Sequence, residues 1–83
     1  MREVKDNLDL AVLQKDGRGY ILNDRWDRRM IHKAGCEAVV AMVTSAYKKI
    51  FFEDGEEAVT WLQAEKENIG RDWASCGMCG GVG

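Results

Sequence analysis

Two cysteines, Cys76 and Cys79, stand three positions apart near the end of this 83-residue chain. The chain holds one other cysteine, Cys36, and a single histidine, His32, four positions before it. A Cys-x-x-Cys pair can chelate one metal ion through two thiolates, but a structural tetrahedral site needs two more ligands. The four residues would together form a Cys₃His site that uses every soft ligand of the protein. Such a site restricts the fold, because it ties the tail to the middle of the chain.

Glycines flank the cysteine pair and add to this interpretation. The segment Cys76-Gly77-Met78-Cys79-Gly80 resembles the knuckle of zinc-ribbon proteins, in which glycine lets backbone amides approach the sulfurs. The resemblance implies zinc as the cofactor. The alternative is a buried free Cys36, an exposed His32 and a frayed tail with two reduced thiols. The predicted metal ligands are His32, Cys36, Cys76 and Cys79.

The same pair supports a second function, in thiol redox chemistry or metal handling. The segment Trp73-Ala74-Ser75-Cys76-Gly77-Met78-Cys79 resembles the tryptophan-led Cys-x-x-Cys of thioredoxin-like proteins. In those proteins the nucleophilic cysteine is activated at the start of a helix. Here the glycine-rich residues 80–83 follow, and they are unsuited to a helix. We therefore keep this function as the alternative.

Composition is typical of one ordinary globular domain, with 46% hydrophobic and 31% charged residues. A chain of 83 residues can form only a small hydrophobic core, and such domains are often stabilised by a metal ion or a partner subunit. The net charge of -2 argues against a dedicated nucleic-acid binder, which normally has a basic excess. The charged start lacks a signal-peptide pattern, and the longest apolar run, 38–43, is too short to span a membrane. We expect a cytoplasmic protein, whose thiols stay reduced.

The first half of the chain predicts two strands and a helix. Leu8–Leu13 alternates apolar residues at period two, which indicates a strand. The pair Asp16-Gly17 suits a hairpin turn, and Tyr20–Asn23 returns as the second strand. From Arg25 to Ala34, apolar residues recur at every fourth position, which predicts a helix with Asp24 as its N-cap and Gly35 at its end.

The second half predicts the same order of elements. Residues 37–43 are apolar on both faces, as in a strand that is covered on both sides, although a helix over 37–47 is the competing interpretation. Residues 47–52 follow as a fourth strand. The next helix is the best specified: Asp54 caps it, Glu57 completes an acidic capping box and Gly70 ends it.

A shift of thirty residues aligns the two halves, so the order of strand, strand and helix occurs twice. The predicted fold class is α+β: a four-stranded, mostly antiparallel sheet with two helices in ββαββα order. We expect one domain over residues 1–83, with a body at 8–69 and an irregular cysteine-containing tail at 70–83.

A short segment carries one partial family resemblance. Ile50-Phe51-Phe52-Glu53-Asp54-Gly55-Glu56-Glu57-Ala58-Val59-Thr60-Trp61-Leu62 is similar to a phrase in several small STAS-related bacterial proteins. It covers one strand and one helix, and it implies no function for this chain. No family resemblance extends over all 83 residues.

Charge suggests where a partner would bind. A basic face on the predicted first helix would face an acidic partner protein, nucleic acid or the acidic second helix of another copy, although charge runs are commonly only solvated faces. No catalytic triad or phosphate-binding loop is present in the sequence. We therefore expect a non-enzymatic regulatory module that binds a protein partner or forms a homodimer through its sheet edges. The predicted partner-binding residues are Arg25, Arg28, Arg29 and Lys33.

Overall fold

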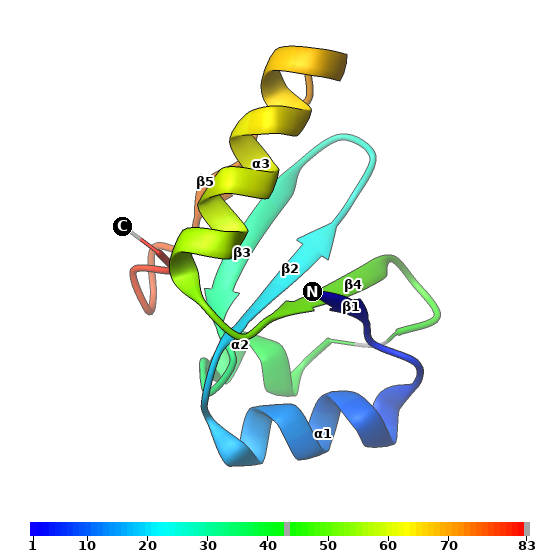
Figure 1. Cartoon of the computed structure of the whole chain (residues 1–83). Helices are drawn as coiled ribbons and strands as arrows, with labels where there is room; N and C mark the ends of the chain where they lie inside the picture. The colour runs from blue at the N-terminus through cyan, green and yellow to red at the C-terminus, as the bar shows by residue number, and fades with distance from the viewer. Residues whose placement is uncertain (43, 83) are drawn as a thin grey trace.

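Within residues 1–42 and 44–82, which the computed structural model describes, five strands form a mixed sheet and three helices pack on it, an α+β fold (Figure 1). The strands are β1 (Arg2–Glu3), β2 (Tyr20–Asp24), β3 (Arg29–Lys33), β4 (Lys48–Phe52) and β5 (Ala74–Ser75). The helices are α1 (Asn7–Asp16), α2 (Glu37–Val40) and α3 (Gly55–Ile69). The strand order is β1-β4-β2-β3-β5, and neighbours are antiparallel except for β3 and β5.

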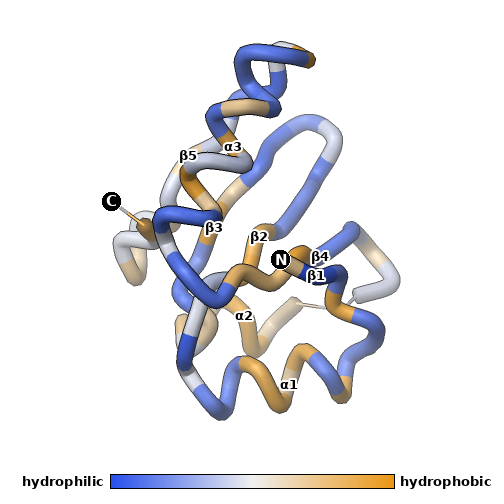
Figure 2. The backbone as a smooth tube through the Cα atoms, in the orientation of Figure 1, coloured by the Kyte–Doolittle hydropathy of each residue, from blue (hydrophilic) through white to orange (hydrophobic). Residues whose placement is uncertain are grey.

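Strand β2 lies at the centre of the sheet and separates two hydrophobic cores. It pairs along its whole length with β3 on one side and β4 on the other. Because successive side chains of a strand point to opposite faces, Ile21 and Leu22 enter different cores. Ile21 packs with the buried residues of α1 and α2, and Leu22 packs with those of α3. Figure 2 shows hydrophobic segments along the central strands and a hydrophilic connection between β2 and β3.

The connection from β2 to β3 is a hairpin, so the helix predicted over 25–34 is wrong. Residues 29–33 form β3, and the amide of Arg28 donates to the carbonyl oxygen of Arg25 at the hairpin tip. The apolar stripe Trp26, Met30 and Ala34 has a spacing of four. Because four is a multiple of two, this spacing fits one face of a strand as well as one face of a helix.

The strand predicted over 8–13 is also wrong, because this segment lies within α1. The Asp6 side chain accepts a hydrogen bond from the Asp9 amide at 2.8 Å, which caps the helix. Gly17 ends the helix with a φ of 77°, and its amide donates to the Leu13 carbonyl. Asp16-Gly17 is therefore a helix terminus and not the predicted hairpin turn.

Residues 37–42 do not form the predicted strand either. Helix α2 occupies 37–40 and buries Val39, which is closer to the competing helix prediction but shorter. The last residue of the predicted strand, Val43, lies outside the described residues. The β-branched residues favoured a strand on propensity, but Val39 is buried as part of one helical turn while Val40 is 68% exposed, so tertiary packing overrides that preference.

The predictions for the remaining elements are confirmed, except that the Glu57 side chain binds the N-terminal amine at 3.2 Å and does not complete a capping box. Strands β2 and β4 match the predicted 20–23 and 47–52 within a residue, and α3 is the predicted second helix. The Asp54 side chain accepts from the Glu56 amide at 3.3 Å, and Gly70 ends the helix with a φ of 71°. The predicted four-stranded sheet in ββαββα order and the predicted correspondence between two halves of thirty residues are wrong. Residues 8–13 are helical, β3 and the hairpin connection replace the helix predicted over 25–34, and β1 and β5 widen the sheet.

Among the described residues, no helix has both the length and the apolar content that crossing a bilayer requires.

Candidate metal centre

The four predicted metal ligands come from two segments that lie side by side. His32 is on β3, and Cys36 follows the turn after it, in which the Cys36 amide donates to the Lys33 carbonyl at 2.9 Å. Cys76 follows β5, which runs parallel to β3. The Gly80 amide donates to the Cys76 carbonyl at 2.8 Å, which closes the turn that carries Cys79.

The ligand atoms of His32, Cys36, Cys76 and Cys79 all lie within 4.8 Å of one another. The first three side chains are buried and Cys79 is half-buried. All three cysteines are free thiols, and the sulfurs of Cys36 and Cys76 are 4.0 Å apart. The structure therefore brings together the four residues that the sequence spacing predicted, in a group that could hold a metal ion.

Backbone amides surround the sulfurs. The Met78 amide donates to Cys76 Sγ at 3.4 Å, and the Lys33 amide donates to Cys79 Sγ at 3.3 Å. The amides of Ala38 and Gly81 also donate to Cys36 and Cys79, respectively. Each thiol thus receives an amide from the residue two positions later. Such hydrogen bonds stabilise the thiolate, which is the form that binds metal.

Gly81 has a structural role in this arrangement. Its φ is +52°, and a Cβ atom at this position would lie 2.7 Å from the Ile31 carbonyl oxygen and 2.8 Å from the Ser75 side chain. A larger residue therefore cannot bring the amide of position 81 to the Cys79 sulfur without moving the backbone. The knuckle needs glycine here for close approach, as the sequence resemblance implied.

The thiols differ in acidity. Burial, together with the nearby thiols of Cys79 and Cys76, raises the pKa of Cys36 to about 11. Burial also acts to raise the pKa of Cys79, but hydrogen bonds from the Gly81 and Lys33 amides and from the other two thiols outweigh it. The pKa of Cys79 is therefore lowered.

His32 fits the role of the fourth ligand. Burial lowers its pKa, which favours the neutral imidazole that coordinates metals. Its Nδ1 atom is buried and has no hydrogen-bond partner among the described residues. An unpartnered nitrogen beside three thiols is the arrangement that a metal ion would satisfy. A set of three sulfurs and one nitrogen suits zinc better than magnesium or calcium, which prefer oxygen.

The group belongs to the core that lies against the helices α1 and α2. Cys36 and Cys76 pack with Leu10, Ile21 and Val39, and they lie between the sheet and the helices α1 and α2. On the other side of the sheet, Phe52 and Leu62 are fully buried, with partly buried tryptophans packed around them. An ion at the cysteines would link the tail to the core beside α1 and α2.

The predicted partner-binding residues do not form one helical face. Arg25 and Arg28 lie in the hairpin connection, and Arg29 and Lys33 lie at the two ends of β3. Lys33 and Arg28 are exposed, whereas Arg29 is only 4% exposed. The predicted basic helix face is therefore wrong, because a hairpin spreads these four residues over different surfaces.

Arg29 instead belongs to an internal ion-pair network. Its guanidinium binds Asp24 at 2.9 Å and Glu65 at 3.1 Å, and it lies 5.0 Å from the centre of the Trp61 ring. Arg71 also binds Asp24, at 3.1 Å from the same Oδ1 atom. The network joins the hairpin to α3 and to the segment after it. The sequence pattern did not reveal this network, because its pairs span up to 47 positions.

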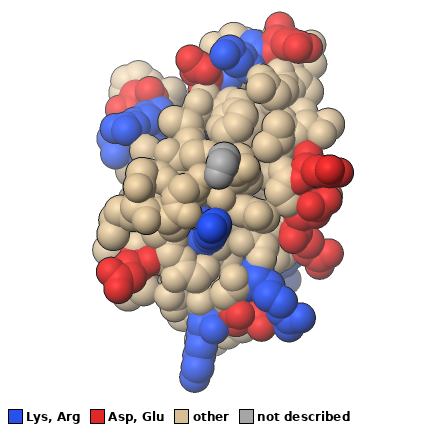
Figure 3. Space-filling view, turned by 90° about the vertical axis from the view of Figure 1, so that its left-hand side faces the viewer, with Lys and Arg blue, Asp and Glu red and all other residues tan. Residues whose placement is uncertain are grey.

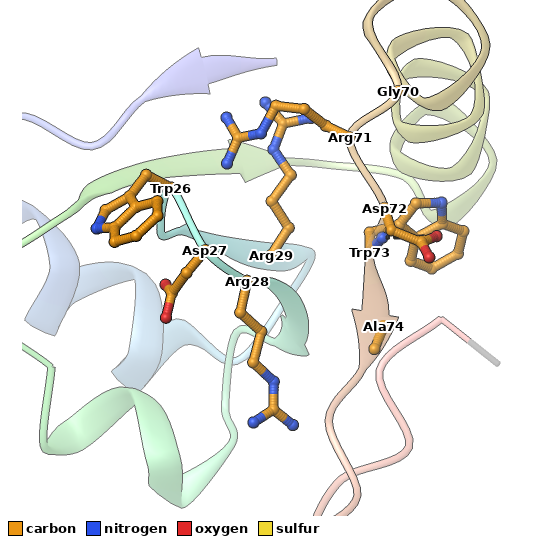
Figure 4. Close-up of a pocket in the computed structure, with 9 residues that line it drawn as sticks. All are labelled: Trp26, Asp27, Arg28, Arg29, Gly70, Arg71, Asp72, Trp73 and Ala74. Carbon is orange, nitrogen blue, oxygen red and sulfur yellow. Dashed lines mark hydrogen bonds between the residues drawn. The ribbon is translucent and has the colours of Figure 1, made fainter.

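A cleft of about 350 Å³ opens between the hairpin tip and residues 70–74 (Figure 4). In Figure 4, Trp26 and Trp73 stand on opposite sides of the cleft, and Arg28 points away from Arg71. Trp26 is 84% exposed, so it does not belong to either hydrophobic core. The polar residues around it in the sequence were the available signal for an exposed turn.

The face over β5 and the C-terminal tail has few charges near its centre. In Figure 3, Lys, Arg, Asp and Glu side chains lie mostly along the margins of this face, with one basic side chain near the middle. The two charge types are interspersed along those margins. The face therefore offers no extended basic surface of the kind that nucleic-acid binding requires.

Comparisons with protein-family models, with curated proteins and with solved structures find no match to this chain.

Proposed function

We propose that this protein is a small non-enzymatic binding module whose tail is held in place by a structural zinc ion. The observation that carries the proposal is the convergence of one imidazole and three thiols within 4.8 Å. Four protein ligands complete a tetrahedral site and leave no position for substrate, which is typical of structural zinc. Zinc supplies folding free energy at such a site, since unfolded chains rarely hold the ligands together.

The binding surface in this proposal is the hairpin tip, which we define as Arg25, Trp26 and Arg28. An exposed tryptophan beside arginines is the composition of interface hot spots. Arg25 also lies 4.9 Å from the centre of the Tyr47 ring, which holds one side of the tip. We propose a protein partner in the cytoplasm, where thiols stay reduced and available to zinc. A second copy of the chain is the other candidate partner.

Zinc content and stability test the proposal together. Native mass spectrometry of protein purified without chelator should show one zinc per chain. Cys76→Ser should lose the zinc and destabilise the fold, because it removes one of four ligands. Gly77→Ala is a matched control, since an added Cβ there meets nothing within 4 Å. A zinc-free protein, or a Cys76→Ser variant with wild-type zinc content and stability, would overturn the proposal.

One observation supports the alternative function in thiol redox chemistry or metal handling. Cys79 is half-buried and its pKa is lowered, which are features of a reactive thiol. In that case Cys79→Ser should abolish reaction with a disulfide probe and leave the fold intact. A structural site predicts the reverse: the zinc-loaded protein resists alkylation, and Cys79→Ser lowers its melting temperature.

A further inference from the structure

A second cavity, of about 280 Å³, lies against the metal centre and under the hairpin. Among the described residues that line it there is no aspartate or glutamate. His32 forms part of its wall, so the cavity and the metal centre share one side chain. The lining residues are Asn23, Arg25, Arg28, Met30, His32, Ala38, Ala41 and Met42.

Two of the residues that line the cavity, Asn23 and His32, carry polar atoms that lack partners. Asn23 Oδ1 and His32 Nδ1 are buried and form no hydrogen bond with the described residues. His32 as a whole is only 4% exposed. A buried polar atom without a partner costs about 1–3 kcal/mol, so native structures seldom leave one unpaired. Zinc can satisfy the His32 nitrogen, whereas Asn23 Oδ1 is left without a donor among the described residues.

The arginines give the cavity its charge. Arg25 binds Asp27 at 3.2 Å, but both side chains are more than 40% exposed, so this pair is weak and can exchange for another anion. Arg28 forms no ion pair with a described residue, in contrast to the buried Arg29 beside it. A guanidinium fork binds a carboxylate through two parallel hydrogen bonds. The rim of the cavity is therefore suited to one carboxylate.

The rest of the wall is apolar and small. Met30 comes from β3, Ala38 from α2, and Ala41 and Met42 from the residues that follow α2. Methionine side chains adapt to apolar groups of different shapes. The volume is below the usual range for drug-sized ligands, so the cavity suits a group the size of one amino-acid residue.

We propose that this cavity binds the C-terminal residue of a partner polypeptide that ends in an apolar side chain. The terminal carboxylate pairs with Arg28 and Arg25, the last backbone amide donates to Asn23 Oδ1, and the side chain packs on Met30 and Met42. A ligand oxygen also accepts from the imidazole nitrogen of His32 that the metal leaves free, a contact that metal-binding histidines generally need. The inference rests on the proposed function, which supplies the protein partner and the zinc that orients His32.

Peptide binding to the zinc-loaded full chain tests this assignment. The probe is an N-acetylated hexapeptide that ends in leucine with a free carboxylate, and its C-terminal amide is the comparison. Titration calorimetry should show at least about tenfold weaker binding for the amide, the loss expected for one charge-assisted hydrogen bond. Arg28→Gln should weaken binding of the peptide with the free carboxylate to a similar degree. Arg18→Gln is the control, because Arg18 is exposed, pairs with Asp16 and does not line the cavity.

Each outcome decides one point. Equal binding of the acid and the amide, or no binding of either by zinc-loaded protein, would overturn the inference and leave the zinc proposal intact. N-acetyl-leucine that binds as tightly as the hexapeptide would identify a free small carboxylate as the ligand and overturn the assignment to a polypeptide end. Peptide binding by protein that holds no zinc would support the cavity and contradict the zinc proposal.

Discussion

The amide of Cys76 donates a hydrogen bond of 2.9 Å to the carbonyl oxygen of Ile31, the residue before His32. This bond extends the parallel pairing of β3 and β5 and sets Cys76 beside the imidazole. The backbone therefore brings two ligands from distant segments together. Because the sheet already holds these two ligands together, metal binding has to overcome a smaller loss of chain entropy.

Gly81 provides a test of the knuckle that leaves all four ligands in place. Gly81→Ala forces a Cβ to within 2.7 Å of the Ile31 carbonyl, so the tail must shift. We expect weaker zinc binding, measured by competition with a chromophoric chelator, and a lower melting temperature. Gly77→Ala should leave both at wild-type values, because nothing lies within 4 Å of its Cβ. Equal behaviour of the two variants would contradict the account of the knuckle.

Removal of Arg29 should be costly. Arg29→Ala leaves Asp24 without its closest partner, and the side chain of Asp24 is only 10% exposed. Loss of one member of a buried ion pair typically costs about 3–5 kcal/mol in the free energy of unfolding. Arg18→Ala removes an exposed pair and should cost less than about 1 kcal/mol. Urea denaturation of the two variants measures both values, and similar losses would argue against an internal network.

The core beneath α3 should depend on Leu62. This side chain is fully buried among β2, β3 and β4, so Leu62→Ala should lower the free energy of unfolding by about 2–5 kcal/mol. Ile69 is 58% exposed at the end of the same helix. Ile69→Ala should therefore change stability by less than about 0.5 kcal/mol, as most exposed positions do. Thermal denaturation followed by circular dichroism would show whether the two variants differ.

Trp26 should matter for binding and not for folding. At 84% exposure its indole contributes little buried area, so Trp26→Ala should keep the wild-type melting temperature within about one degree. Affinity for a protein partner should fall at least tenfold, as for a hot-spot residue (about 1.4 kcal/mol). A large loss of stability in this variant would instead show that Trp26 stabilises the folded structure.

The successful predictions rest either on residue types that act locally or on the small number of histidines and cysteines in the chain. The Asp54 cap and the Gly70 terminus define α3 within its own segment, so no tertiary contact was needed to find them. The group of four candidate metal ligands was predicted because one histidine and three cysteines leave one way to complete a tetrahedral site. Their approach in space depends on β5, which is too short to recognise from two residues.

The errors arose where two periodicities coincide. Leu8, Leu10 and Val12 alternate as in a strand, but Leu10 and Leu13 also share a helical face, and the Asp6 cap decides for α1. In the hairpin, both faces of β3 are covered, so its polar residues were mistaken for a solvent-facing helix surface. Arg29 is buried where it binds Glu65, and His32 is buried beside the cysteines. Because most of these partners lie far away in the sequence, the local pattern did not indicate the burial.

X-ray absorption at the zinc edge tests the central claim most directly. For the zinc-loaded protein, the account predicts four-coordinate zinc with three sulfurs at about 2.3 Å and one nitrogen at about 2.0 Å. His32→Ala should remove the imidazole scattering and keep the sulfur shell if the variant still holds zinc. Zinc bound mainly by oxygen or nitrogen, or by fewer than three sulfurs in the wild-type protein, would contradict the account.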